Sequence, residues 1–169
     1  MFKKPIIDTA NFMAAAAKTA PKTRGIDNIE IVVVTDKKTI NSISLTMEKL
    51  GKKLGRNSFI RDSANIKDLE AIVIIGVISN PAGLNCGFCG FENCQKLTKS
   101  GGVCAYNSID LGIAVSSAAN TANNFHIDNR IMYSVGKTAM ELKLFTKDVK
   151  LALGIPLSVS GKNIFFDRQ

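Results

Sequence analysis

The chain has 169 residues, 46% of them hydrophobic, and carries 22 Lys and Arg against 14 Asp and Glu, for a formal charge of +8. This length and apolar content predict one domain, residues 1–169, with a buried core. The basic residues are dispersed and do not alternate with aromatic ones, which argues against nucleic-acid binding. No apolar run is long enough for a bilayer span or a signal peptide, so we expect a cytoplasmic protein with no membrane partner.

The first third of the chain predicts two helices around one strand. Residues 8–19 are rich in alanine and end before Pro21, as expected of a helix. Residues 29–35 form a β-branched run typical of a buried strand. A second helix is indicated by apolar residues three or four positions apart, and it is expected to end near Gly51 or Gly55. Those apolar residues are Ile40, Ile43, Met47, Leu50 and Leu54.

The remaining segments continue this alternation. Residues 70–78 are almost continuously Ile and Val, which predicts a strand in the centre of a sheet. Further helices are expected at about 108–120 and 131–145, a third strand at 149–155, and a short fourth strand at 163–166. The pattern indicates an α+β fold in which a Gly-rich loop, residues 80–107, is inserted after a central strand.

All four cysteines of the chain lie in that loop, with the spacing Cys-x2-Cys-x4-Cys-x9-Cys: Cys86, Cys89, Cys94 and Cys104. In a reducing compartment, clustered cysteines favour metal binding or redox chemistry over disulfides. A zinc ribbon usually has two Cys-x2-Cys pairs, and this loop has one. Nearby glycines let backbone N–H groups approach sulfur, which suits an iron–sulfur cluster. The pattern favours a 4Fe–4S cluster, with structural zinc or free or catalytic thiols as alternatives.

A second polar cluster lies between the first helix and the first strand. It contains Lys22, Arg24, Asp27 and Asn28, with a glycine at position 25. One interpretation is a solvated connecting loop. The other is a pocket for phosphate or carboxylate, because Lys and Arg beside a glycine suit anion binding.

These segments resemble a family of uncharacterised ferredoxin-domain-containing proteins. The similarity is carried by residues 84–94 (L-N-C-G-F-C-G-F-E-N-C), by Cys104, and by residues 19–28, 109–113, 128–133 and 153–168. It spans nearly the whole chain. The resemblance implies a 4Fe–4S redox centre held by the four cysteines, and it implies no settled activity.

A more distant similarity is to the nitroreductase family of flavoproteins. Residues 14–21, Asn28, the strand at 29–34 and Leu153-Gly-Ile-Pro156 are similar to that family's opening helix, Ala-Pro-Ser loop, first strand and Gly-Tyr-Pro segment. The chain lacks that family's Arg-Arg-Ser-x-Arg segment before residue 8 and its Gln-Pro-Trp after Asn28. The resemblance implies a three-layer sandwich and a homodimer with FMN at its interface. Its implied flavin contacts are Lys22, Arg24, Asn28 and Arg168.

Together these features predict electron transfer through a 4Fe–4S cluster, with a bound flavin as a further electron carrier. The alternative is a structural zinc or small-ligand-binding protein without redox turnover. FMN-dependent oxidoreductase is the enzyme class that the resemblance implies, and no catalytic residue is identified. Small residues in the helix near 111–119 are expected to pack on a second copy of the chain.

Overall fold

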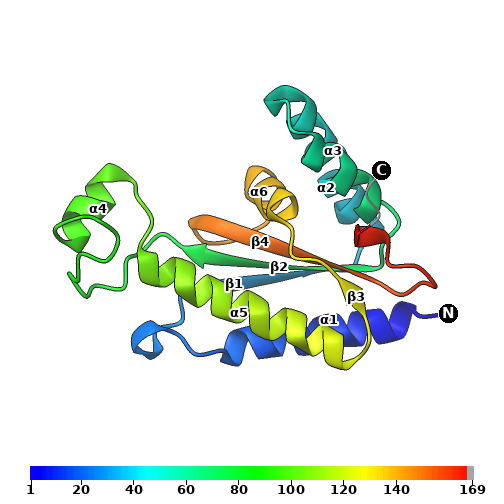
Figure 1. Ribbon diagram of the computed structural model, residues 1–169, viewed down its shortest axis with the longest axis horizontal. Coiled ribbons are helices and arrows are strands. Elements are labelled where there is room, and N and C mark those ends of the chain that lie inside the picture. Colours follow the sequence, from blue (N-terminus) through cyan, green and yellow to red (C-terminus); the bar gives the residue numbers. More distant parts are fainter. Residues whose placement is uncertain (167–169) are drawn as a thin grey trace.

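A four-stranded antiparallel sheet forms the middle layer of the protein, and helices cover both of its faces (Figure 1). The computed structural model describes residues 1–166 of the chain. Across the sheet the strands run in the order β1 (Ile29–Val34), β2 (Ala71–Ile78), β4 (Val149–Ser158) and β3 (Asp128–Asn129). The three layers agree with the predicted α+β sandwich.

Two hydrophobic cores lie on opposite faces of β2. Alternate residues of a strand point to opposite faces, so Val73 and Ile75 enter one core and Ile72 and Ile74 enter the other. The first core is covered by α1 (Lys3–Thr19) and α5 (Ala105–Asn124). The second is covered by α2 (Lys37–Leu54), α3 (Asn57–Ile66) and α6 (Tyr133–Glu141). Because both faces of β2 are buried, its sequence is apolar almost throughout.

Helix α6 lies unusually close to β4 because residue 136 has no side chain. A Cβ atom built on Gly136 would stand 1.9 Å from the carbonyl oxygen of Ala152. Opposite it, a Cβ on Gly154 would stand 2.2 Å from a methyl carbon of Val135. The two glycines therefore set the distance between this helix and the sheet.

Strand β4 continues through a proline, which the sequence suggested would end it. Gly154 exchanges both backbone hydrogen bonds with Met132, so its peptide groups face the outer side of β4. Pro156 is two residues further on and faces the same side, where β3 pairs only with Leu157 and Ser158. Its missing N–H therefore interrupts no bond to β2.

Other differences concern the ends of elements and two short helices. Helix α1 begins at Lys3 because Pro5 lies in its first turn, where the missing N–H has no helical partner to lose. Helices α3 and α4 (Cys94–Ser100) were not expected. The predicted strand at 163–166 is wrong. The side chain of Asn163 accepts a hydrogen bond from the backbone N–H of Phe165 and closes a 3-10 turn there.

Glu30 ties the segment before β4 to strand β1. Its carboxylate accepts hydrogen bonds from the backbone N–H groups of Thr146 and Lys147, at 2.7 and 3.0 Å, and from the Thr146 hydroxyl at 2.8 Å. Burial opposes ionisation of this carboxyl, but the hydrogen bonds outweigh it and hold the pKa of Glu30 below its usual range.

This pKa shift predicts a pH-dependent contribution to stability. A carboxyl whose pKa is lower in the folded state stabilises the fold above its unfolded-state pKa, and the contribution is lost as pH falls through the folded pKa. Glu30→Gln is therefore expected to be less stable than the native chain at neutral pH, with a difference that shrinks in acid. Urea unfolding of both chains from neutral pH to about pH 3 checks this. A constant difference across that range would contradict it.

Candidate functional site

Residues 80–107 form a lobe at one end of the molecule, beyond the ends of β2 and α5 (Figure 1). We call this segment the cysteine lobe. It has a small hydrophobic core separate from the two that flank the sheet, built on Ala82, Leu97 and Cys104. Phe91 and Tyr106 pack against that core and partly cover it. The lobe therefore keeps its shape through contacts of its own.

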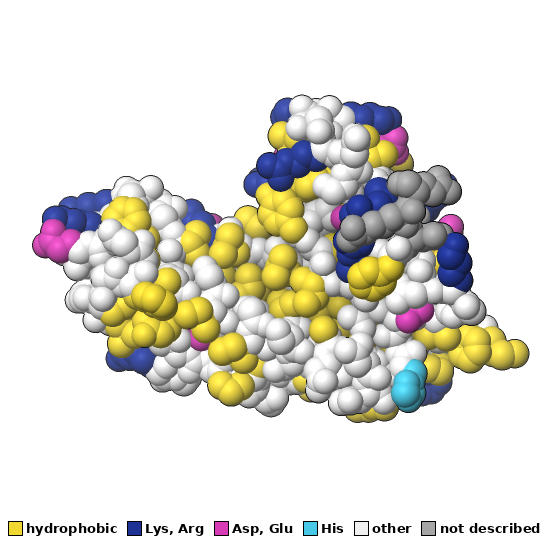
Figure 2. All heavy atoms as spheres, viewed as in Figure 1, with side chains coloured by type: hydrophobic (Ala, Val, Ile, Leu, Met, Phe, Trp, Pro, Cys, Tyr) yellow, Lys and Arg dark blue, Asp and Glu magenta, His cyan; other side chains and the backbone are white. Residues whose placement is uncertain are grey.

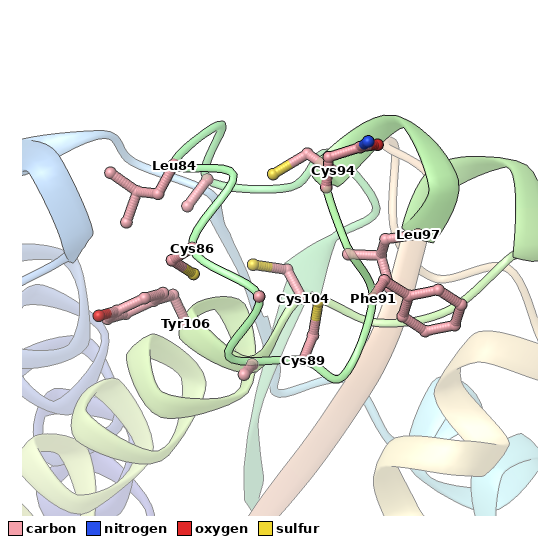
Figure 3. Close-up of a pocket in the computed structure, with 12 residues that line it drawn as sticks. Leu84, Cys86, Cys89, Phe91, Cys94, Leu97, Cys104 and Tyr106 are labelled. Carbon is pink, nitrogen blue, oxygen red and sulfur yellow. The ribbon is translucent and has the colours of Figure 1, made fainter.

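All four cysteines line one narrow, largely apolar cavity inside the lobe (Figure 3). Cys86 is exposed, Cys89 and Cys94 are half-buried, and Cys104 is buried. Figure 3 shows their side chains directed into the space between the loop and the first turns of α4 and α5. No histidine or carboxylate lines this cavity. The donor set is therefore entirely thiol.

The four thiols line the cavity without forming a ready site for a single ion. Within residues 1–166, no three His, Cys, Asp or Glu side chains are placed to bind a single metal ion. In a structural zinc site, four ligands stand about 2.0–2.3 Å from one ion. In a cubane cluster each thiolate binds a different iron, so the four sulfur atoms stand further apart.

Left-handed backbone conformations allow the loop to coil around this cavity. Gly83, Gly87 and Gly90 have φ values between +71° and +82°, a region that glycine adopts without steric cost. Asn85 shares this conformation, with φ +47°. Its side-chain oxygen accepts from the N–H of Cys94 at 2.9 Å, and its own N–H donates to the Cys94 Sγ at 3.4 Å. This reciprocal pair fixes one thiol and gives its sulfur a hydrogen bond.

The first two turns of α5 hold the lobe to the rest of the protein through two buried polar side chains. The Asn107 Nδ2 donates to the carbonyl oxygens of Ile78 and Asn80, at 3.2 and 2.7 Å, where the chain leaves β2. Asp110 is 2% exposed and accepts from the N–H and hydroxyl of Thr23 at 2.9 to 3.1 Å. Sequence reasoning missed both residues, although a carboxylate amid the apolar residues of a helix is a usable signal.

The polar cluster after α1 contacts the cysteine lobe through one residue. Arg24, in a left-handed conformation, donates from Nη1 to the carbonyl oxygen of Ala82 at 3.1 Å, and Ala82 lines the thiol cavity. One member of this predicted set therefore contacts the wall of the thiol cavity. A flavin contact by Arg24 stays a prediction.

Of the other predicted flavin contacts, Lys22 and Asn28 are among the described residues. The Lys22 ammonium donates to the carbonyl oxygens of Ala17, Lys18 and Ala20, at 3.3, 2.6 and 2.8 Å, and so closes the end of α1. Asn28 is buried, and its carbonyl oxygen accepts from the N–H of Ile78. Arg168 lies outside the described residues. The three N–H groups of Lys22 are thus already used within the chain.

The predicted small-residue face of α5 is used inside the protein. Ala114 and Ala118 are fully buried in the core between α5 and α1. The outward face carries Ile109 and Ile113, which are 43% and 37% exposed. No helix among residues 1–166 is long and apolar enough to cross a bilayer.

Comparison with known sequences identifies two similarities. Residues 100–168 match the family model described as "uncharacterized protein containing a ferredoxin domain" (DUF2148). This match begins after the first three cysteines and includes Cys104. An uncharacterised protein of Archaeoglobus fulgidus is 40% identical over 168 residues, which cover 94% of this chain and 89% of that protein.

Solved structures with the same fold include nitroreductases. One is a nitroreductase of Desulfitobacterium hafniense with bound FMN, at TM-score 0.62 and 14% identity, covering 92% of this chain and 78% of that one. Another, from Bacteroides thetaiotaomicron, is described as an NADH dehydrogenase/NAD(P)H nitroreductase, at TM-score 0.62 and 11% identity over 92% and 74% of the two chains. The scaffold is therefore nitroreductase-like, as the sequence predicted.

Proposed function

Because the chain belongs to the family of uncharacterised proteins that contain a ferredoxin domain, we propose that it is an iron–sulfur redox protein. In this proposal, Cys86, Cys89, Cys94 and Cys104 hold a 4Fe–4S cluster, and residues 80–107 form an iron–sulfur lobe on a nitroreductase-like scaffold. When bound, the cluster supplies reversible one-electron transfer.

The observation that carries this proposal is the convergence of all four thiols on one apolar cavity that, among residues 1–166, no histidine or carboxylate lines. The surroundings suit a redox role as well. Burial of Cys104 limits solvent access, and the N–H of Asn85 donates to the Cys94 sulfur; both features set the potential of a thiolate-bound cluster.

The protein's own residues then determine what the centre can contact. Phe88 and Leu84, which are 64% and 41% exposed, form the outer surface of the lobe beside the exposed thiol of Cys86. Helix α4 carries Lys96 and Lys99, and Lys96 is ion-paired with Glu92. The apolar surface, together with the formal charge of +8 on the chain, favours an acidic redox partner protein, because opposite charge speeds encounter.

Anaerobic reconstitution with iron and sulfide tests the proposal directly. We expect about four irons and four acid-labile sulfides per chain, with visible absorption that bleaches on chemical reduction. Stoichiometric zinc without labile sulfide would establish the alternative, a structural metal site without redox turnover.

Two finer predictions remain proposals. A homodimer is supported by the exposed Ile109 and Ile113, and sedimentation at micromolar concentration tests it. A flavin as further electron carrier is supported by the shared fold with an FMN-containing nitroreductase. The Lys22 ammonium already donates to three carbonyl oxygens of the chain, and Asn28 is buried. A cytoplasmic location likewise remains a prediction.

A further inference from the structure

Helices α2 and α3 project from the body of the protein toward the end opposite the cysteine lobe (Figure 1). We call residues 37–67, which contain both helices, the basic arm. They include eight Lys and Arg against two Asp and Glu, a net +6 of the formal charge of +8. Figure 2 shows Lys and Arg side chains gathered on this projection. Although basic residues occur along the whole chain, most of its net charge therefore stands on one part of the surface.

Most cations of the basic arm have no ionic partner in the chain. Three of them form an ion pair with a carboxylate: Lys37, Lys52 and Arg61. The other five are exposed and make no ion pair among residues 1–166: Lys38, Lys49, Lys53, Arg56 and Lys67. A cluster of exposed, unpaired cations attracts a partner that carries many negative charges.

The tip of the basic arm, residues 52–58, is exposed at every position and joins α2 to α3. It has no acidic residue, and its basic residues are Lys52, Lys53 and Arg56. Leu54 lies among them and is 49% exposed, and Ile60 is 37% exposed. Both apolar side chains adjoin Gly51. Leu54 follows it by three residues on α2, and a Cβ atom built on Gly51 would stand 2.8 Å from Cγ1 of Ile60. The tip thus combines a small apolar patch with surrounding positive charge.

Buried contacts hold the tip in a fixed shape. Phe59 is 1% exposed, and its ring packs edge-on against Tyr133 with the ring centres 5.9 Å apart. The Ser44 hydroxyl donates to the carbonyl oxygen of Ser63 at 2.9 Å and so joins α2 to α3. A partner therefore does not have to order this segment when it binds, which lowers the entropic cost of association.

These features fit the surface of a bilayer that contains anionic phospholipids. The negative potential of such a surface attracts Lys and Arg, and an apolar side chain beside them enters the boundary between headgroups and acyl chains. A nucleic acid would use the cations but not Leu54 and Ile60. Stacking of its bases would need an exposed aromatic side chain, whereas Phe59 is buried. The exposed apolar pair therefore favours the lipid surface.

We propose that the tip of the basic arm binds anionic bilayers peripherally, with Lys53 and Arg56 at the level of the phosphates and Leu54 at the acyl boundary. The expectation of no membrane partner rested on the absence of a spanning segment, and a peripheral contact needs none. The proposal does not depend on the redox function proposed for the cysteine lobe.

Cosedimentation of the full chain with vesicles tests the proposal. We expect binding to phosphatidylcholine vesicles with about 30% phosphatidylglycerol, and little binding to phosphatidylcholine alone. The binding is expected to weaken as salt rises, because salt screens exposed charges. Each basic side chain near the surface contributes about fivefold to the binding constant. Replacing Lys49, Lys53 and Arg56 together with Gln is therefore expected to weaken binding at least about thirtyfold.

The matched control removes the same net charge from exposed positions outside the basic arm. It replaces Lys99, Lys137 and Lys150 with Gln. Because these side chains lie away from the tip, binding is expected to stay within about threefold of the native chain. Equal losses in the two triple variants would show that net charge alone attracts the vesicles, and would overturn the proposal.

The apolar contact is tested with Leu54→Asn, which is expected to weaken vesicle binding about three- to tenfold. The control is Leu45→Asn, at a 59% exposed leucine on the same helix. This position lies about 14 Å before Leu54 along the helix axis. The control is expected to leave binding within about twofold. Urea unfolding of each variant checks that the fold is kept, which is expected because every changed position is exposed.

Two further results would overturn the proposal: no binding of the native chain to the anionic vesicles, or no loss of binding in Leu54→Asn. A duplex oligonucleotide in place of the vesicles provides the comparison. Binding to the duplex that Leu54→Asn leaves unchanged, without binding to vesicles, would identify the basic arm as a nucleic-acid surface.

Discussion

Alanine at position 136 is expected to destabilise the protein by about 3 kcal/mol, although alanine is ordinarily the better helix former. The added Cβ would stand 1.9 Å from the Ala152 carbonyl oxygen, and that oxygen belongs to the backbone of a central strand. Both atoms are fixed to the backbone of regular elements, so the clash is relieved only if α6 moves away from β4. Denaturant unfolding of the native chain and of Gly136→Ala measures the difference.

Gly112→Ala is the control for this change. It is the same substitution in another helix, and its Cβ would meet no atom within 4 Å. Alanine there is expected to stabilise the protein by about 0.5–1 kcal/mol. Equal effects at the two positions would contradict the close packing of α6 on β4.

Cys86→Ser is expected to reduce the iron of the reconstituted protein from about four per chain to less than about one, because the cluster loses one of its four thiolates. Cys86 is exposed, so unfolding of the metal-free chain is expected to stay unchanged. Iron and labile-sulfide assays give the first result and urea unfolding gives the second.

Gln95→Ser provides the comparison in the same lobe. It introduces serine at an exposed position next to Cys94 and leaves all four thiols in place, so it is expected to keep the full iron content. Full iron in Cys86→Ser would show that this thiol is not a ligand. Loss of metal-free stability in Cys86→Ser would point to a packing role for the side chain.

Strands β1 and β2 were predictable because burial on both faces of a strand produces a run of apolar residues. Residues 29–35 and 70–78 were expected, and strands occur at Ile29–Val34 and Ala71–Ile78. Helix α3 was not, because Gly55 was read as the end of a helical segment. It is a left-handed cap, and the chain starts a new helix two residues later. The local sequence indicated the end of α2 but not the start of α3.

For the site, the sequence identified the cysteines, because clustered thiols are seldom needed for packing alone. Four clustered thiols indicate a metal, and the structure brings all four to one cavity. Lys22 and Arg24 were ambiguous because ammonium and guanidinium groups bind carbonyl oxygens as readily as phosphate. Lys22 closes a helix end and Arg24 holds Ala82. The partner of Arg24 lies 58 residues away along the chain, and no spacing rule reveals it.

The bond between Asn107 and the carbonyl oxygen of Asn80 joins the two ends of the cysteine lobe at 2.7 Å. The chain therefore leaves the scaffold and returns to it at adjacent positions, and the lobe between them is a closed loop. A segment tethered in this way adds little loop-closure entropy to the folding of the parent sheet and leaves its strand register untouched. In evolutionary terms, such an attachment permits a scaffold to acquire, exchange or lose a lobe of this kind without redesign of its core.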